Sequence, residues 1–395
     1  KMTATGPDDI IEEKALPPKV NPFLTSSTEC PICKSEVPCC HIKPSIYSER
    51  DKDVDLRPRT VKWLKEGYSE HHPRLYYMLH CSHCHFTADS ETFEAPSNQC
   101  SLSAAKFSKR FTALYTQNRQ VKKIVNKLSS GINVLSLDLY QAVKLHLLAI
   151  FQFQLFDEIA KKDAMNIGRY CLRLAWLYRD IYELDTKKKE QAGRIIKLIR
   201  SLKKDWPLIP ANEKTALKMA AQYYQTTLEG SYAVETVYDE INLLMILSRI
   251  HMKLGDIPEA HTFLGSGKAK FRNFERETSE LMRLSAQADK AAQSRRQDDS
   301  PMPKKKVSDE QLSEMTTDSR KLKFLTDEVQ MLFEDVQDEW ETKQKEKANK
   351  IIEAHQDKPV EELRRILLHN KIDKGVVLKL YPEQTKKKGL FNIFD

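Results

Sequence analysis

Residues 28–36 read TECPICKSE, and two residues separate Cys30 from Cys33 within this stretch. A second pair, Cys81 and Cys84, has the same gap in the stretch LHCSHCHFT. This gap allows both sulfurs of one turn to approach the same ion, and four thiolates satisfy the tetrahedral coordination of Zn²⁺. The sequence therefore predicts a single structural zinc site, in which the metal replaces a core too small to hold itself together.

Other roles for these cysteines fit the sequence less well. Most of the eight cysteines fall within residues 30–100, which in a reducing compartment favours metal binding over a disulfide framework. A redox role requires a βαβ setting, and a catalytic zinc requires an open coordination position and a base such as the glutamate of HExxH; neither pattern occurs. Alternative ligands flank both pairs, and we interpret them as bystanders. They are Cys39, Cys40, His41, His80, His83 and His85.

The segment between the two pairs is longer than the roughly 15–20 residues of a compact four-cysteine site, so it must carry its own strands or loop. Acidic and basic residues alternate in SERDKDVDLRPRT, residues 48–60. A calcium loop of the EF-hand type needs glycine at its sixth position and glutamate at its twelfth, where this chain has Leu56 and Lys62. We therefore predict a polar strand edge with Asp–Arg pairs. The alternating residues are Asp51, Asp53, Asp55 and Arg57.

The composition predicts a soluble, mainly helical protein. Hydrophobic residues make up 40% and charged residues 30% of the 395 residues, with only 11 glycines. No apolar run reaches the roughly 18 residues of a membrane span, and no secretory leader pattern is present, which favours a cytoplasmic location. The net charge of +8 comes from well-mixed residues, so the basic run KKKEQAGRIIKLIRSLKK, residues 187–204, is predicted to be a solvated helix face.

Hydrophobic periodicity and turn-forming residues divide the chain into five segments. They are an irregular lead-in (1–28), a zinc-ribbon-like module with a few short strands (29–100), a helical domain similar to tetratricopeptide repeats (TPR-like, 101–290), a linker (291–310) and a C-terminal helical region with a basic and apolar tail (311–395). Predicted helices in the helical domain span 102–129, 136–162, 165–182, 187–206, 212–230, 236–254 and 258–274. A long helix over 311–356 and a small one over 359–370 follow the linker.

The long C-terminal helix carries an apolar stripe that steps by three and four residues. The stripe lasts two heptads, which is short for an independent coiled coil. We therefore predict that it docks against its own domain rather than forming a dimer by itself. Its members are Leu322, Leu325, Val329, Leu332 and Val336.

Residues 241–269 resemble one TPR in register, with Gly255 in the turn between two helices. Small residues occupy positions where paired helices approach closely. They are Ser248, Ala260 and Gly267. Residues 171–180 repeat the first-helix pattern in a degenerate form. Stacked helix pairs of this kind present a concave face that holds a peptide or helix of another protein, and Arg173 and Arg179 are candidates for such a groove.

The combination of CPIC, RDKDVDLRP, YYMLHCSHCHFTA and CLRLAWLYR resembles an uncharacterised bacterial family, catalogued as a domain of unknown function. The family is described as having an N-terminal zinc-ribbon-like part followed by TPR-like helices. The resemblance covers about residues 28–275 and implies a fold and a bacterial origin, without assigned catalytic residues. Such families usually show Cys-Pro-x-Cys-Gly-Tyr at the second cysteine pair, where this chain has CSHCHF at residues 81–86. The thiolates are kept, and a turn glycine is lost.

These patterns predict a non-enzymatic, zinc-stabilised scaffold or adaptor. It is expected to bind protein partners through its TPR-like surface and C-terminal helices, in a larger bacterial assembly that can be membrane-bound. Metal removal is expected to melt residues 29–95. The alternative is nucleic-acid binding through the zinc ribbon and helix 187–204, although acids populate the ribbon region and aromatics do not interleave with the basic residues. No small-molecule substrate is expected, and membrane contact is expected only through the tail KKKGLFNIFD, residues 386–395.

Overall fold

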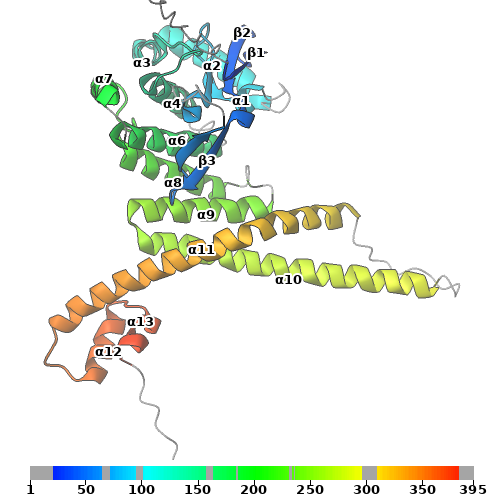
Figure 1. The fold of residues 1–395 in the computed structure, drawn as a ribbon, viewed down its shortest axis with the longest axis vertical. Coiled ribbons are helices and arrows are strands. Elements are labelled where there is room, and N and C mark those ends of the chain that lie inside the picture. Colours follow the sequence, from blue (N-terminus) through cyan, green and yellow to red (C-terminus); the bar gives the residue numbers. More distant parts are fainter. Residues whose placement is uncertain are drawn as a thin grey trace, which may run out of the picture. The chain divides into compact units, whose positions relative to one another are not determined.

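The structure is a computed structural model in which the prediction of a mainly helical chain with a few short strands near its N-terminus is confirmed (Figure 1). It describes residues 21–64, 72–94, 101–156, 163–183, 186–230, 234, 236–295 and 309–381. The chain forms two compact units. The first comprises Lys1–Asp53, Pro58–Gln152 and Trp176–Ile209, and the second comprises Val54–Arg57, Phe153–Ala175 and Pro210–Asp395. These units interleave along the chain.

The strands form three separate antiparallel hairpins. They are β1 (Phe23–Glu29) with β2 (Glu36–Ile42), β3 (Tyr47–Lys52) with β4 (Pro58–Trp63), and β5 (Met78–His80) with β6 (Thr87–Asp89). Two short 3₁₀ helices, η1 (Pro44–Ile46) and η2 (Pro73–Tyr76), join them. The segment between the cysteine pairs therefore carries strands of its own, as predicted. Part of the predicted lead-in belongs to β1, because the chain is already paired with β2 at Phe23.

The helices that follow the hairpins lie close to the predicted positions. They are α1 (Ser90–Glu94), α2 (Ser101–Gln117), α3 (Arg119–Ser129), α4 (Leu139–Gln154), α6 (Ala164–Glu183) and α7 (Thr186–Leu202). The prediction of one helix over 102–129 is wrong, because Asn118 interrupts it. The Asn118 side chain accepts hydrogen bonds from the N–H groups of Gln120 and Val121, so it begins a new helix as an N-cap.

The second unit contains most of the remaining helices. They are α8 (Glu213–Glu229), α9 (Val237–Leu254), α10 (Ile257–Arg295), α11 (Asp309–Glu353), α12 (Val360–His369) and α13 (Lys374–Leu380). Helix α10 continues well beyond the predicted end at residue 274. The predicted linker 291–310 is helical at both of its ends, and residues 296–308 lie outside the described residues.

Helices α9 and α10 form an antiparallel pair with the close approach that the small residues predict. Gly255 ends α9 in the left-handed conformation with a φ of 76°, which glycine adopts without strain. The Ser248 hydroxyl donates to the Ala260 carbonyl oxygen at 2.8 Å. A Cβ atom added to Gly267 would lie 3.6 Å from the Leu244 Cβ atom, an ordinary van der Waals distance, so the two helices are close together at this point.

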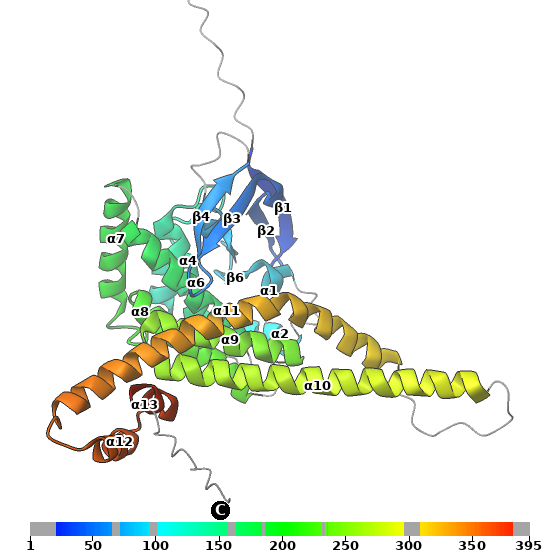
Figure 2. The same ribbon diagram turned by 60° about the horizontal axis from the view of Figure 1, so that its bottom comes forward.

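Helix α11 packs across α9 and α10, and both views show this crossing (Figures 1 and 2). Leu332 and Val336 are buried against apolar side chains of these two helices, so the prediction of a docking stripe is confirmed for this part. The side chains of Leu322, Leu325 and Val329 lie outside the described residues. The core partners are Ile241, Met245, Ala260, Leu264 and Phe274.

The C-terminal helices pack on the end of α11 and form a small core of their own. Its buried members are Ala348, Leu367, Ile372, Val376 and Val377. The Gln344 side chain of α11 accepts from the Asp373 N–H at 3.1 Å, and Asp373 caps α13. None of the described helices combines the length and apolarity that crossing a membrane requires. The tail at 386–395 lies outside the described residues.

Candidate metal centre

The first cysteine pair forms the turn between β1 and β2. The Cys30 N–H donates to the Ser35 carbonyl oxygen at 2.9 Å, and the Cys30 carbonyl oxygen accepts from the Lys34 N–H at 3.0 Å. Lys34 has a φ of 65°, a left-handed conformation that turns the chain back toward β2. The turn brings Cys33 close to Cys30 on one side of the hairpin.

The second pair repeats this geometry in the turn between β5 and β6. The Cys81 N–H donates to the Phe86 carbonyl oxygen at 2.9 Å, and the Cys81 carbonyl oxygen accepts from the His85 N–H at 2.8 Å. His85 has a φ of 64°. It occupies the position at which the families that this chain resembles usually have glycine. The loss of the turn glycine therefore leaves the turn itself intact, because histidine adopts the same backbone conformation.

All four sulfurs converge. The Sγ atoms of Cys30 and Cys84 are 3.6 Å apart, and those of Cys33 and Cys81 are 3.5 Å apart. Every sulfur lies within 4.8 Å of the others. Sulfurs bound at 2.3 Å to a tetrahedral ion are about 3.8 Å apart. The four cysteines that the sequence singled out are thus placed together, with no disulfide among them, and they can hold a metal ion.

Electrostatics within the cluster also call for a cation. The pKa of Cys81 lies far below its usual range because the thiols of Cys30 and then Cys84 donate hydrogen bonds to its sulfur. The same hydrogen bonding to Cys81 raises the pKa of Cys30 to about 12, and the pKa of Cys84 is raised by its bonds to Cys30 and Cys81. Four thiolates therefore cannot coexist here by themselves, whereas a bound metal ion deprotonates its coordinating thiols.

The flanking histidines and cysteines remain outside this group of four. The Nδ1 atom of His80 is 2.8 Å from the Thr87 hydroxyl, and burial, followed by the neighbouring His85, lowers the pKa of His80 to about 4. The Cys39 thiol donates to the Val37 carbonyl oxygen at 3.8 Å, and burial raises the pKa of Cys40 to about 11. Within the described residues, the four sulfurs form the one cluster of potential ligands.

A buried glutamine on α4 fixes the second turn. The Oε1 atom of Gln152 accepts from the Thr87 N–H at 3.0 Å, and its Nε2 atom donates to the His85 carbonyl oxygen at 2.6 Å. Gln152 is fully buried, so these bonds form away from water and leave little freedom to the turn. Gln152 was not predicted from the sequence to support the site. The feature that could have indicated it is the presence of an amide side chain within the apolar run LLAIFQFQLF.

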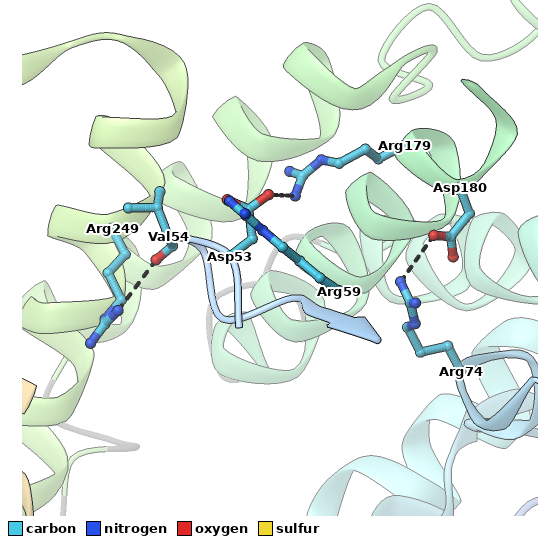
Figure 3. A network of polar contacts seen from close by, with 7 residues as sticks. All are labelled: Asp53, Val54, Arg59, Arg74, Arg179, Asp180 and Arg249. Atoms are coloured by element: carbon cyan, nitrogen blue, oxygen red, sulfur yellow. Dashed lines mark hydrogen bonds and ion pairs between the residues drawn. The ribbon is translucent and has the colours of Figure 1, made fainter. Parts of the chain in front are cut away.

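Buried ion pairs connect the β3–β4 hairpin and η2 to α6 within the first unit (Figure 3). The Asp53 carboxylate accepts from Arg179 at 2.8 Å and from Arg59 at 3.2 Å. Arg74 donates to Asp180 at 3.0 Å. The predicted Asp–Arg pairing is therefore met by Asp53 and Arg59, whereas the predicted polar strand edge is wrong at Asp53, which is buried and follows the end of β3. Arg179, proposed from the sequence as a groove residue, is instead buried and paired.

The other residues of the alternating stretch take separate roles. Asp51 accepts from the Thr60 hydroxyl at 2.8 Å across the hairpin. In the second unit, Asp55 and Arg57 are almost completely buried. The neighbouring Val54 carbonyl oxygen accepts from Arg249 of the same unit at 3.4 Å (Figure 3).

Comparison with known proteins gives one match. Residues 23–285 match a family described as an uncharacterized protein conserved in bacteria (DUF2225). No curated protein and no solved structure matches the chain. The match covers both cysteine pairs, the hairpins and helices α1 to α9, and it ends within α10. Because it spans well over half of the 395 residues, the chain belongs to this bacterial family.

Proposed function

We propose that the protein is a non-enzymatic adaptor in which a structural Zn²⁺ stabilises the N-terminal hairpins and helical surfaces bind protein partners in a larger bacterial assembly. The observation that supports it most is the closed set of four sulfurs, of which those of Cys30 and Cys81 belong to fully buried residues. Four sulfurs in a tetrahedron suit zinc. They leave no coordination position for a substrate, which catalytic zinc sites keep open.

Metal analysis tests the zinc part of this proposal. Purified full-length protein should contain zinc in equimolar amount by elemental analysis. Cys84→Ser should lose the metal, because serine supplies a far weaker ligand. Cys171→Ser is the matched control, since Cys171 is a buried free thiol of the second unit and should leave the zinc content unchanged. A wild-type protein without metal, or equal zinc in both variants, contradicts the proposal.

The adaptor part rests on the helices from α9 onward, of which α11 to α13 lie beyond the family match. The α9–α10 pair supplies TPR-like packing, and α11 to α13 extend the helical surface. Large apolar side chains are exposed on this extension, with Val360 48%, Leu368 46% and Leu378 36% accessible. Exposed leucines on a small helical module suit the contact of an amphipathic partner helix, which anchors itself by apolar side chains.

Point variants test the adaptor part better than truncation does. Removing α11 would expose the core around Leu332 and Val336, so a truncated chain would lose stability as well as contacts. The double variant Leu368→Ser and Leu378→Ser should abolish co-purification of a stable partner from the native bacterium. Met331→Ser, at a still more exposed position on α11, should retain it. If the wild-type chain co-purifies with nothing, the protein is not an adaptor of this kind.

A further inference from the structure

Helices α3 and α7 of the first unit are neighbours at one end. The Lys123 ammonium group of α3 lies 2.6 Å from the Asp205 carboxylate, and the Gln120 side chain donates to the Asp205 carbonyl oxygen at 2.5 Å. Asp205 lies three residues after Leu202, where α7 ends. The beginning of α3 is therefore held against the end of α7.

The same two helices meet again through α4. Lys144 of α4 donates to the carbonyl oxygen of Ser130, the residue that ends α3. The Arg194 guanidinium group of α7 lies 4.1 Å from the ring centroid of Tyr140, and the Lys144 ammonium group lies 5.4 Å from the same ring. The end of α3 and the middle of α7 therefore both contact α4, while Asp205 connects the beginning of α3 to the end of α7.

Basic residues dominate the outer faces of both helices. Residues 119–130 contain four basic and no acidic residues, and residues 190–205 contain five basic and two acidic residues. Burial, followed by the nearby Arg194, lowers the pKa of Lys144 to about 8, as expected where cationic groups are crowded. Six of the basic side chains are exposed and form what is here called the α3–α7 basic surface. They are Arg119, Lys122, Lys197, Arg200, Lys203 and Lys204.

The spacing of these residues gives each helix a row of positive charge. Arg119 and Lys122 are three residues apart on α3. Lys197 and Arg200 are three residues apart on α7, and Lys204 follows after four more. Residues three apart share one face of a helix, so Arg119 and Lys122 share a face of α3, and Lys197 and Arg200 share a face of α7. The bonds of Lys123 and Gln120 to Asp205 bring the beginning of α3 to the end of α7, so the two rows meet at this junction.

We propose that the α3–α7 basic surface binds the phosphodiester backbone of a nucleic acid without reading its bases. Regular rows of positive charge match the regular negative charge of a phosphate backbone. A lysine-rich surface suits this partner better than a protein, because lysine is depleted in protein–protein interfaces. A membrane surface would require bulky apolar side chains within the rows, and the described part of α7 exposes Ile196 alone.

This surface differs from the one that the sequence indicated. The sequence paired helix 187–204 with the zinc ribbon, whereas the contacts pair α7 with α3. The four positive charges of α3 were not singled out, because the contact that brings them to the end of α7 joins Lys123 to Asp205, 82 residues apart in the chain. The side chains of Lys187, Lys188 and Lys189 lie outside the described residues and carry no part of the proposal.

Binding of labelled 20-base-pair duplexes, one of DNA and one of RNA, tests the proposal with the zinc-loaded full-length chain. Fluorescence anisotropy should show binding to at least one duplex that weakens as salt increases. The triple variant Lys122→Gln, Lys197→Gln and Arg200→Gln should flatten the slope of log K against log salt by about 3, since each lost phosphate contact removes about 0.9. The matched control is Lys214→Gln, Lys218→Gln and Lys345→Gln, three exposed lysines of the second unit, and it should bind as the wild type does.

The proposal is overturned if neither duplex binds at low salt, or if the triple variant and the wild type bind equally well. If neither duplex binds, and vesicles containing phosphatidylglycerol bind the wild type but not the triple variant, the surface belongs to an anionic membrane. Binding of only one duplex supports the proposal and identifies DNA or RNA as the source of the phosphates.

Discussion

At the scale of single residues, the turns that carry the cysteines depend on a left-handed backbone at Lys34 and His85. For residues other than glycine this conformation costs about 1–2 kcal/mol, and the cost is largest for β-branched residues. The free energy of unfolding of Lys34→Gly should therefore exceed that of Lys34→Val by at least about 1 kcal/mol. Both variants lose the exposed ion pair of Lys34 with Glu29, so their difference isolates the backbone term. Urea unfolding of the metal-loaded protein measures it.

The exposed strand residue Ser27 supplies the control for this comparison. Ser27 lies in β1, where an extended backbone favours valine over glycine. Ser27→Val should therefore be more stable than Ser27→Gly, the reverse of the order at Lys34. If glycine and valine rank alike at the two positions, backbone conformation at Lys34 does not limit the stability of the turn.

At the scale of elements, the contact between α6 and α8 in the second unit depends on Gly168. A Cβ atom at this position would lie 2.8 Å from Cδ1 and 2.9 Å from Cε1 of the buried Tyr224 ring. Gly168→Ala should lower the free energy of unfolding by about 1–3 kcal/mol, because the helices or the ring must move. Circular dichroism during urea unfolding measures the change.

A second helical glycine provides the matched control. A Cβ atom at Gly265 of α10 would meet nothing within 4 Å. Gly265→Ala should raise stability by about 0.5–1 kcal/mol, because alanine loses less backbone entropy in a helix. If alanine changes the free energy of unfolding equally at the two sites, the Tyr224 ring moves aside without an energetic cost.

The elements also show why the sequence predicted some features and missed others. The cysteine turns and the α9–α10 turn at Gly255 were predictable, because their geometry depends on residues a few positions apart. The continuation of α10 beyond residue 274 was missed because the side chains that follow are mostly polar and exposed, so little apolar periodicity marks them as helical. The Arg179–Asp53 pair joins residues 126 positions apart, so no local sequence pattern could predict it.

At the scale of the whole molecule, metal binding should stabilise more than the hairpins that supply the ligands. The second cysteine turn is bonded to Gln152 of α4, and Arg74 beside β5 is paired with Asp180 of α6. The sequence predicted that metal removal melts residues 29–95. We expect chelation of the metal to raise amide hydrogen exchange in α4 and α6 as well, because a buried ion pair or amide that loses its partner is strongly destabilising. Exchange in α9 should stay unchanged, since its core belongs to the second unit.

The variant Gln152→Met distinguishes energetic coupling between the metal site and α4 from a general loss of stability. It removes both bonds to the turn while keeping an apolar side chain of similar length, so the metal-loaded variant should lose about 1–3 kcal/mol of stability. With the connection gone, chelation should raise exchange in α4 less in Gln152→Met than in the wild type. Gln141→Met removes a bond to Gly131 at the other end of α4 and should leave the wild-type response to chelation intact. Equal responses in all three proteins would show that the metal site and α4 are energetically independent.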